Sequence, residues 1–143
     1  MTLELKIKRL HKDATLPTKA HPGDAGWDLY AYDVVGIDAW GSLLVPTGIA
    51  VAIPCGWCGI IKDRSSVALK QSCEVGAGVI DHGYTGELKV LLRNLSPKIK
   101  WFNRGDRIAQ LLLVPVPEVT LVEVGEFEEE TARGEGSFGS TGK

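Results

Sequence analysis

Hydrophobic and polar residues alternate along much of the chain, which is the pattern of half-buried β-strands. The alternation is clear from Leu3 to Leu10, and further apolar runs cover residues 41–54, 59–63, 86–95, 107–117 and 119–127. The run at 41–54 is interrupted near Pro46 to Gly48, so it predicts two strands. Turn-forming residues bound nearly all of the runs. Many short strands at this spacing predict an all-β sandwich or barrel.

Two segments depart from the strand pattern. Residues Ser65 to Gln71 are predicted to form one short helix that begins on a serine cap. Residues 126–130 are acidic, and the chain beyond Thr131 is rich in glycine. We therefore expect a folded domain over residues 1–127 and a mobile arm over residues 128–143.

Composition narrows the possible partners. The 143 residues carry 16 basic and 18 acidic side chains, a formal net charge of −2, without a basic block. Duplex nucleic acid is therefore not expected as a partner, because its binding usually needs clustered lysine and arginine. No apolar run reaches the roughly 18 residues of a membrane span, and the first residues lack the apolar core of a signal peptide. The cytoplasm is the expected compartment.

Cys55 and Cys58 form a C-x-x-C pair, which leaves two interpretations open. Such a pair can be redox-active or can supply half of a zinc site. Pro54 and Gly56 instead mark a turn between two β-type runs, and no second pair supplies the missing zinc ligands. We favour the turn. The odd number of cysteines also argues against a secreted disulfide framework.

Several polar side chains stand where they could act on a phosphorylated ligand. Arg64 is followed by two serines at the start of the predicted helix, which offers a guanidinium, hydroxyl groups and free N–H groups to an anion. Asp81 lies between an apolar run and a turn. In most proteins such an aspartate stabilises a hairpin, whereas in a cleft it can accept a proton from water.

Three more stretches add to this set. Asp24 and Asp28 share a loop before a strand, and Gln110 interrupts a strand that otherwise reads as buried. The glycine-rich end carries Arg133 and Phe138, an arginine that can bind phosphate and an aromatic ring that can stack on a base. The alternative for this end is a disordered terminus without a role.

Taken in order, five stretches resemble the motifs of the trimeric dUTP diphosphatases (dUTPases): DAGWDLYA, RSS, GVIDHGYTGE, GDRIAQL and RGEGSFGSTG. The resemblance extends from about Pro22 to Gly142. It implies a homotrimer of jelly-roll-like β-barrels, all-β except for one short helix. It also implies Mg²⁺-dependent hydrolysis of dUTP to dUMP and pyrophosphate, which limits uracil incorporation into DNA and supplies dUMP for thymidylate synthesis.

The resemblance implies a role for each matched residue. Asp81 is expected to hold the attacking water and the ribose 3′-hydroxyl, and Tyr84 to pack under the sugar and exclude a 2′-hydroxyl. Asp28 is expected to orient a water bound to Mg²⁺. The remaining substrate-binding residues are expected to be Arg64, Ser65, Ser66, Gly78, Ile80, Lys89, Gln110, Arg133, Phe138, Gly139, Ser140 and Thr141.

Within this set, backbone groups of the hairpin at residues 78–84 are expected to read uracil, and Phe138 to stack on it. Arg64, Ser65 and Gln110 are expected to contact the phosphates, and Arg133 the γ-phosphate. The resemblance also implies shared sites. The first, second and fourth motifs would come from one subunit, the third motif from a second subunit and the fifth motif from the third.

Four positions differ from the commoner family pattern: Asp63, Gly83, Thr85 and Ser137. Asp63 stands directly before Arg64, where proline or glycine is usual. A carboxylate there repels a triphosphate unless it turns away or pairs with Lys62. These differences bear on affinity rather than on the type of reaction.

Two other functions were compared with diphosphatase activity. The dCTP deaminases share the trimeric fold, but deamination without zinc needs a glutamate near the base, where this chain has Asp81. Some phage and viral relatives act as regulators by binding a host protein. The chain has no long insertion that would supply a separate binding surface.

Overall fold

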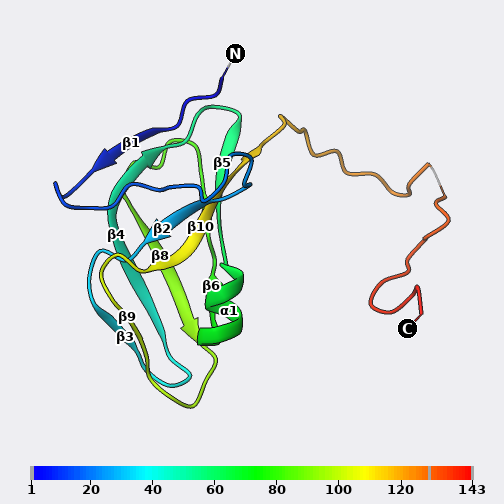
Figure 1. Cartoon of the computed structure of the whole chain (residues 1–143). Helices are drawn as coiled ribbons and strands as arrows, with labels where there is room; N and C mark the ends of the chain where they lie inside the picture. The colour runs from blue at the N-terminus through cyan, green and yellow to red at the C-terminus, as the bar shows by residue number, and fades with distance from the viewer. Residues whose placement is uncertain (1, 129, 143) are drawn as a thin grey trace.

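A computed structural model describes residues 2–128 and 130–142 of the chain. Within them the fold is mostly β-structure with one short helix, α1 (Ser65–Gln71) (Figure 1). The strands are β1 (Lys6–Arg9), β2 (Trp27–Tyr30), β3 (Val35–Ile37), β4 (Ser42–Ala52), β5 (Trp57–Lys62), β6 (Cys73–Gly76), β7 (Val79–Ile80), β8 (Glu87–Asn94), β9 (Lys100–Phe102) and β10 (Arg107–Pro115).

The strands form three antiparallel sheets. Two have four strands, in the orders β1-β4-β8-β6 and β2-β10-β5-β7, and the third pairs β3 with β9. Strand pairing among the described residues does not close these sheets into a barrel. The predicted all-β class with one short helix is therefore confirmed, whereas the single chain does not show the predicted barrel.

Alternation of side chains builds one core between the two larger sheets. Leu88, Val90 and Leu92 of β8 are fully buried at every second position. They join Leu29 of β2 and Leu111 of β10 in a single hydrophobic cluster. Because successive strand residues face opposite sides, this burial fixes the register of each strand.

The helix has the predicted limits but not the predicted cap. Ser65 is its first residue, and Arg64 takes the N-cap position with φ −88° and ψ 135°. No side chain of the described residues caps this end. The serine-cap prediction is wrong because the helix starts at Ser65, one residue earlier than a Ser65 cap requires. The helix ends at Ser72, whose φ of 53° is left-handed.

Two strand predictions are also wrong. Residues 42–52 form one strand, β4, with a shift in register between Pro46 and Ala50 in place of a break. The described residues beyond Pro115 form no strand, although residues 119–127 were expected to form one. Leu121 is 95% exposed and Phe127 89%, because this segment runs away from the sheets (Figure 1). No other part of the described structure covers its apolar side chains.

A cluster around Tyr32 ties the N-terminal loop to the turn before β10. The Arg104 guanidinium lies 4.7 Å from the centre of the Tyr32 ring and pairs with the Asp13 carboxylate. The Tyr32 hydroxyl donates to Asp13 at 3.0 Å, and the His11 ring stacks on Tyr32 at 4.5 Å. The hydrogen bond from Arg104, followed by the one from Tyr32, holds the pKa of Asp13 below its usual value.

Removing the Asp13 charge should lower stability in a pH-dependent way. A carboxylate whose pKa is depressed by folding stabilises the fold above its unfolded pKa, and this contribution is lost as the pH falls through the folded value. We expect Asp13→Asn to lower the melting temperature at pH 7, and the difference from wild type to shrink below about pH 4. Thermal unfolding from pH 7 to pH 3 measures it, with the exposed Glu118→Gln as control. A difference that does not change with pH contradicts this account.

Candidate active site

A cavity of about 250 Å³ gathers residues from three of the predicted motifs. Its position follows from strand register, because Gln110 of β10 pairs with Asp28 of β2 on one side and Lys62 of β5 on the other. The chain after Lys62 leads directly to Arg64 and the helix. The cavity is lined by Ala20, Asp24, Ala25, Gly26, Asp28, Arg64, Ser65 and Gln110.

An ion pair crosses this cavity. Nε of Arg64 donates to Oδ1 of Asp28 at 2.8 Å, and the two side chains are 24% and 14% exposed. Nε of Arg107 lies 3.7 Å from the other Asp28 oxygen. One carboxylate is thus held between two guanidinium groups. Arg107 was not predicted as a site residue. It belongs to the GDRIAQL motif, three residues before Gln110, and this position could have identified it.

Gln110 is fixed by close packing. Its Nε2 donates to the carbonyl oxygen of Asp63 at 2.7 Å. Gly26 lies so close that a Cβ atom there would be 2.2 Å from Oε1 of Gln110. The side chain interrupting β10 therefore has a defined orientation beside the cavity.

The Asp63 carboxylate points away from this cavity's cations. It accepts the backbone N–H of Val75, within β6, and lies 4.0 Å from Nζ of Lys62. The sequence suggested that the Asp63 carboxylate could avoid repelling a triphosphate by turning away or by pairing with Lys62. The structure shows both arrangements together. The nearby Asp24 carboxylate accepts the His21 N–H at 2.8 Å and so caps its own loop. Ser66 lies beside the cavity, with its hydroxyl 3.4 Å from Arg64.

Asp81 and Tyr84 occupy a different part of the sheet. They follow β7, which pairs with β5 through Gly59 and Ile80. Gly78 enters β7 with a φ of +112°, and a Cβ atom there would be 2.7 Å from the Ile61 carbonyl oxygen. Both constraints favour glycine at this position. Strand β7 ends the sheet order, so one backbone edge has no strand partner among the described residues.

The turn after β7 exposes its functional groups. The Tyr84 N–H donates to the Asp81 carbonyl at 3.2 Å, and the Tyr84 hydroxyl donates to the Glu87 carbonyl at 2.8 Å. Tyr84 is 45% exposed, and Asp81 is exposed too. Lys89, on β8, places its ammonium 3.9 Å from the Glu87 carboxylate.

These residues do not line the cavity that holds Asp28. Three strand steps separate β2 from β7 in the sheet order, or about 14 Å at about 4.8 Å per step. Gly59 pairs with both Ile80 and Leu113, so Ile80 is level with Leu113, three residues from Gln110 along β10. Three residues along a strand correspond to about 10 Å, at right angles to the roughly 14 Å across the sheet. Asp28 and Ile80 are therefore roughly 17 Å apart.

The glycine-rich arm is also separate from the cavity. It extends from the end of β10 away from the sheets (Figure 1). Nε of Arg133 donates to the Gly136 carbonyl at 2.9 Å, and the Phe138 side chain is fully exposed. Gly139 has a φ of +86°, and Ser140 and Thr141 are exposed. In the single chain, none of the predicted arm residues lines the cavity.

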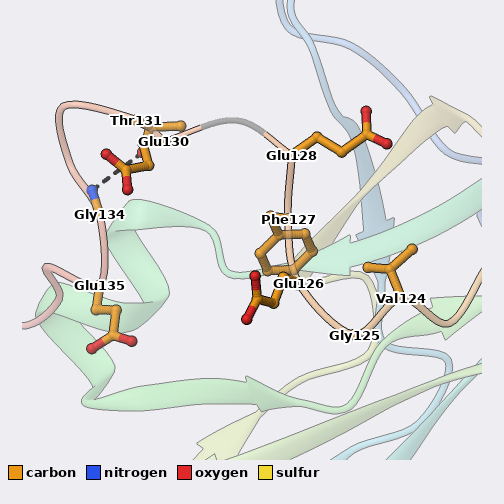
Figure 2. A pocket seen from close by; sticks show the side chains of 9 residues that line it. All are labelled: Val124, Gly125, Glu126, Phe127, Glu128, Glu130, Thr131, Gly134 and Glu135. Carbon is orange, nitrogen blue, oxygen red and sulfur yellow. Dashed lines mark hydrogen bonds between the residues drawn. The ribbon is translucent and has the colours of Figure 1, made fainter.

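A larger hollow of about 1230 Å³ lies along the arm itself (Figure 2). It is bounded by residues between Val124 and Glu135, without a side chain from the sheets. Four glutamates are among its lining residues, so it repels a nucleotide phosphate. These are Glu126, Glu128, Glu130 and Glu135.

Comparison with known proteins places these residues in context. The sequence model of the dUTPase family matches residues 12–142. The chain belongs to the dUTPase family. It is 46% identical to a deoxyuridine 5′-triphosphate nucleotidohydrolase of Mycolicibacterium vanbaalenii, over 99% of this chain and 97% of that protein. The corresponding protein of Saccharomyces cerevisiae is 44% identical, with 96% and 94% covered.

Solved dUTPase structures share the fold. The Staphylococcus bacteriophage 80alpha dUTPase with dUpNHpp superposes with a TM-score of 0.92 at 31% identity, over 99% of this chain and 100% of that one. A dUTPase from phage phi11 of S. aureus, described with a structural Mg(II) ion, gives a TM-score of 0.82 at 27% identity, with 89% and 100% covered.

The donor groups beside the cavity fit the way a dUTPase would hold magnesium. Mg²⁺ prefers oxygen ligands and is often bound by one or two carboxylates together with substrate phosphates. Asp28 is such a carboxylate. The described residues contain no group of three His, Cys, Asp or Glu that could hold a metal alone. A magnesium ion held by Asp28 would therefore need further oxygen ligands, such as substrate phosphates or water.

The cysteines form the expected turn. The Trp57 N–H donates to the Pro54 carbonyl at 3.2 Å across Cys55 and Gly56, and the φ of Gly56 is +80°. All three cysteines are free thiols. Within the described residues, no helix is long and apolar enough to cross a membrane.

The contact between Asp63 and Val75 should be measurable as stability. Asp63→Ala removes the acceptor of a partly buried N–H, which costs about 1 kcal/mol or more. Asp63→Asn keeps an acceptor oxygen at the same place. We therefore expect alanine to lower the melting temperature by several degrees and asparagine to lower it much less, at equal protein concentration. Equal losses in both variants would assign the effect to the charge facing Lys62.

Proposed function

We propose that this chain hydrolyses dUTP to dUMP and pyrophosphate, as a homotrimer that shares each active site among its subunits. The observation that carries the proposal is the separation within one chain of two half-sites. The phosphate half-site contains Asp28, Arg64, Arg107 and Gln110, and the base half-site contains Asp81, Tyr84 and the free edge of β7. A nucleotide has to contact both at once, which two neighbouring subunits can provide.

The phosphate half-site supplies preorganised positive charge. Arg64 and Arg107 are already oriented by Asp28, so they need little rearrangement when a triphosphate binds. Gln110 and Ser65 add donors beside them. Mg²⁺, held by phosphate oxygens and by Asp28 through water, would neutralise phosphate charge and help to orient the chain of phosphates.

The base half-site supplies recognition and the proton acceptor. The free backbone edge at Gly78 to Ile80 pairs with uracil, and Tyr84 lies under the deoxyribose. Asp81 holds a water and accepts its proton while the oxygen attacks the α-phosphorus. The bond from this phosphorus to the bridging oxygen breaks, and pyrophosphate leaves. A general base of this kind contributes about 10²–10⁴-fold.

The arm completes the site. Phe138 stacks on uracil, Arg133 binds the γ-phosphate, and Gly139, Ser140 and Thr141 donate to phosphate oxygens. Closure of the arm excludes water and fixes the reacting groups. Residues 127–133 can span roughly 20 Å when extended, which allows the arm to reach a neighbouring subunit.

The exposed segment before the arm supports the trimer. Val119 is 70% exposed, Leu121 95% and Val122 74%, which is unusual for clustered apolar residues in a monomer. A neighbouring subunit that covers this segment would bury it. In this proposal the jelly-roll barrel and the folded domain of residues 1–127 are complete only in the assembled trimer.

Replacing the proton acceptor should separate chemistry from binding. Asp81→Asn keeps the size of the side chain and loses the basic group. We expect it to bind dUpNHpp with near wild-type affinity and to lower kcat for pyrophosphate release from dUTP by 10²-fold or more. A near-normal kcat removes Asp81 from its role. Release of ammonia from dCTP by the wild-type chain would instead support the deaminase alternative.

Complementation tests the sharing of sites. A chain truncated after Thr131 and a chain with Asp81→Asn should each form nearly inactive homotrimers. Mixed trimers should regain activity if the arm and Asp81 of one site come from different subunits. If both serve the site of their own subunit, mixing restores nothing. Native mass spectrometry should confirm the mixed trimers before absent activity is taken as evidence against shared sites.

A further inference from the structure

We propose that His82 is a positioning residue for the reaction. Its imidazole fastens the turn that carries Asp81 to the end of β4 and so fixes the Asp81 carboxylate relative to the sheet. The inference rests on the proposed role of Asp81. It concerns a side chain that the resemblance to other dUTPases left without a role.

The contact is a hydrogen bond between distant parts of the chain. Nδ1 of His82 lies 2.9 Å from the carbonyl oxygen of Ile53, 29 residues earlier. A carbonyl oxygen can only accept, so Nδ1 carries the proton and donates. Ile53 directly follows β4, and its side chain is 3% exposed. The acceptor therefore belongs to a rigid part of the core.

Other hydrogen bonds of the turn are local. The Tyr84 N–H donates to Asp81, and the Tyr84 hydroxyl donates to Glu87. Such bonds shape the turn without fixing it to the rest of the protein. Among the described hydrogen bonds of residues 81–84, the one from His82 alone reaches a distant segment.

Packing around Gly59 makes the anchor stiff. A Cβ atom at Gly59 would lie 3.2 Å from Cδ1 of Ile53 and 3.3 Å from Cβ of Ile80. Ile53 and Ile80 thus meet over the glycine of β5 that pairs with β7. The His82 bond joins the residue after β4 to the second residue after β7, across the same contact. Asp81 lies between two fixed points, Ile80 and His82.

Such restraint matters because the reaction depends on geometry. A misplacement of about 1 Å can lower a rate by about 10²-fold. Loss of the His82 anchor should therefore act on turnover more than on binding. The phosphate half-site belongs to other residues, and the edge at Gly78 to Ile80 is held by its own pairing with β5. Asparagine can partly replace histidine, because its amide N–H₂ lies near the position of Nδ1 and can donate to the same carbonyl.

The test compares His82→Ala with His82→Asn, and uses His21→Ala, an exposed histidine outside the five motifs, as a matched control. We expect His82→Ala to lower kcat for dUTP at least tenfold, with KM within about threefold and dUpNHpp binding retained. His82→Asn should restore most of kcat, and the control should match wild type. Unchanged kcat in His82→Ala, or no rescue by asparagine, would overturn the proposal.

A second readout does not depend on activity. The imidazole ¹⁵N shifts of His82 in the substrate-free protein should show a protonated Nδ1 at about pH 9, well above the ordinary imidazole pKa of about 6.5. A neutral ring protonated at Nε2 contradicts the anchor, whatever the kinetics. If the wild-type chain releases no pyrophosphate from dUTP while Nδ1 is protonated, the proposed function fails and the anchor stands without its catalytic role, which also overturns the positioning proposal.

Discussion

The antiparallel register of the sheet β2-β10-β5-β7 is the constraint on which the rest of the structure depends. It places Gln110 between Asp28 and Lys62 and carries the chain onward to Arg64. The same register puts β7 at the opposite edge. Because hydrogen-bonded strands cannot slide without turning their buried side chains outward, the phosphate and base half-sites stay apart within a chain.

The Asp28–Arg64 ion pair places oriented charges in the cavity that this sheet positions. Both side chains are mostly buried, so removal of either partner would leave an uncompensated charge. Arg107 on the second carboxylate oxygen adds a second cation, so two guanidinium groups share the one Asp28 carboxylate. These side chains are therefore held for an anionic ligand before it arrives, and the Asp63 carboxylate is engaged by the Val75 N–H.

The sequence predicted those features that depend on local pattern. The apolar runs predicted β1, β5, β8 and β10 and, as two strands, β4, but not the short strands β3, β6, β7 and β9. The helix limits at Ser65 and Gln71 were correct. The residues around the cavity could be predicted because they lie in short motifs that follow one another in the same order as in the dUTPase family. Arg107 was missed because an arginine at the start of a strand is ordinarily a surface residue. The strand at residues 119–127 was wrong because its apolar pattern needs a covering surface, which the described residues do not supply. In the proposed trimer, the contacts of the arm would likewise come from other subunits.

A crystal structure of the full chain with dUpNHpp and Mg²⁺ tests shared half-sites most directly. We predict that the phosphates contact Arg64 and Gln110 of one subunit, while uracil pairs with the β7 edge of a second subunit. Phe138 of the third subunit should stack on the base. A nucleotide that contacts Arg64, Asp81 and Phe138 of the same subunit would contradict the account.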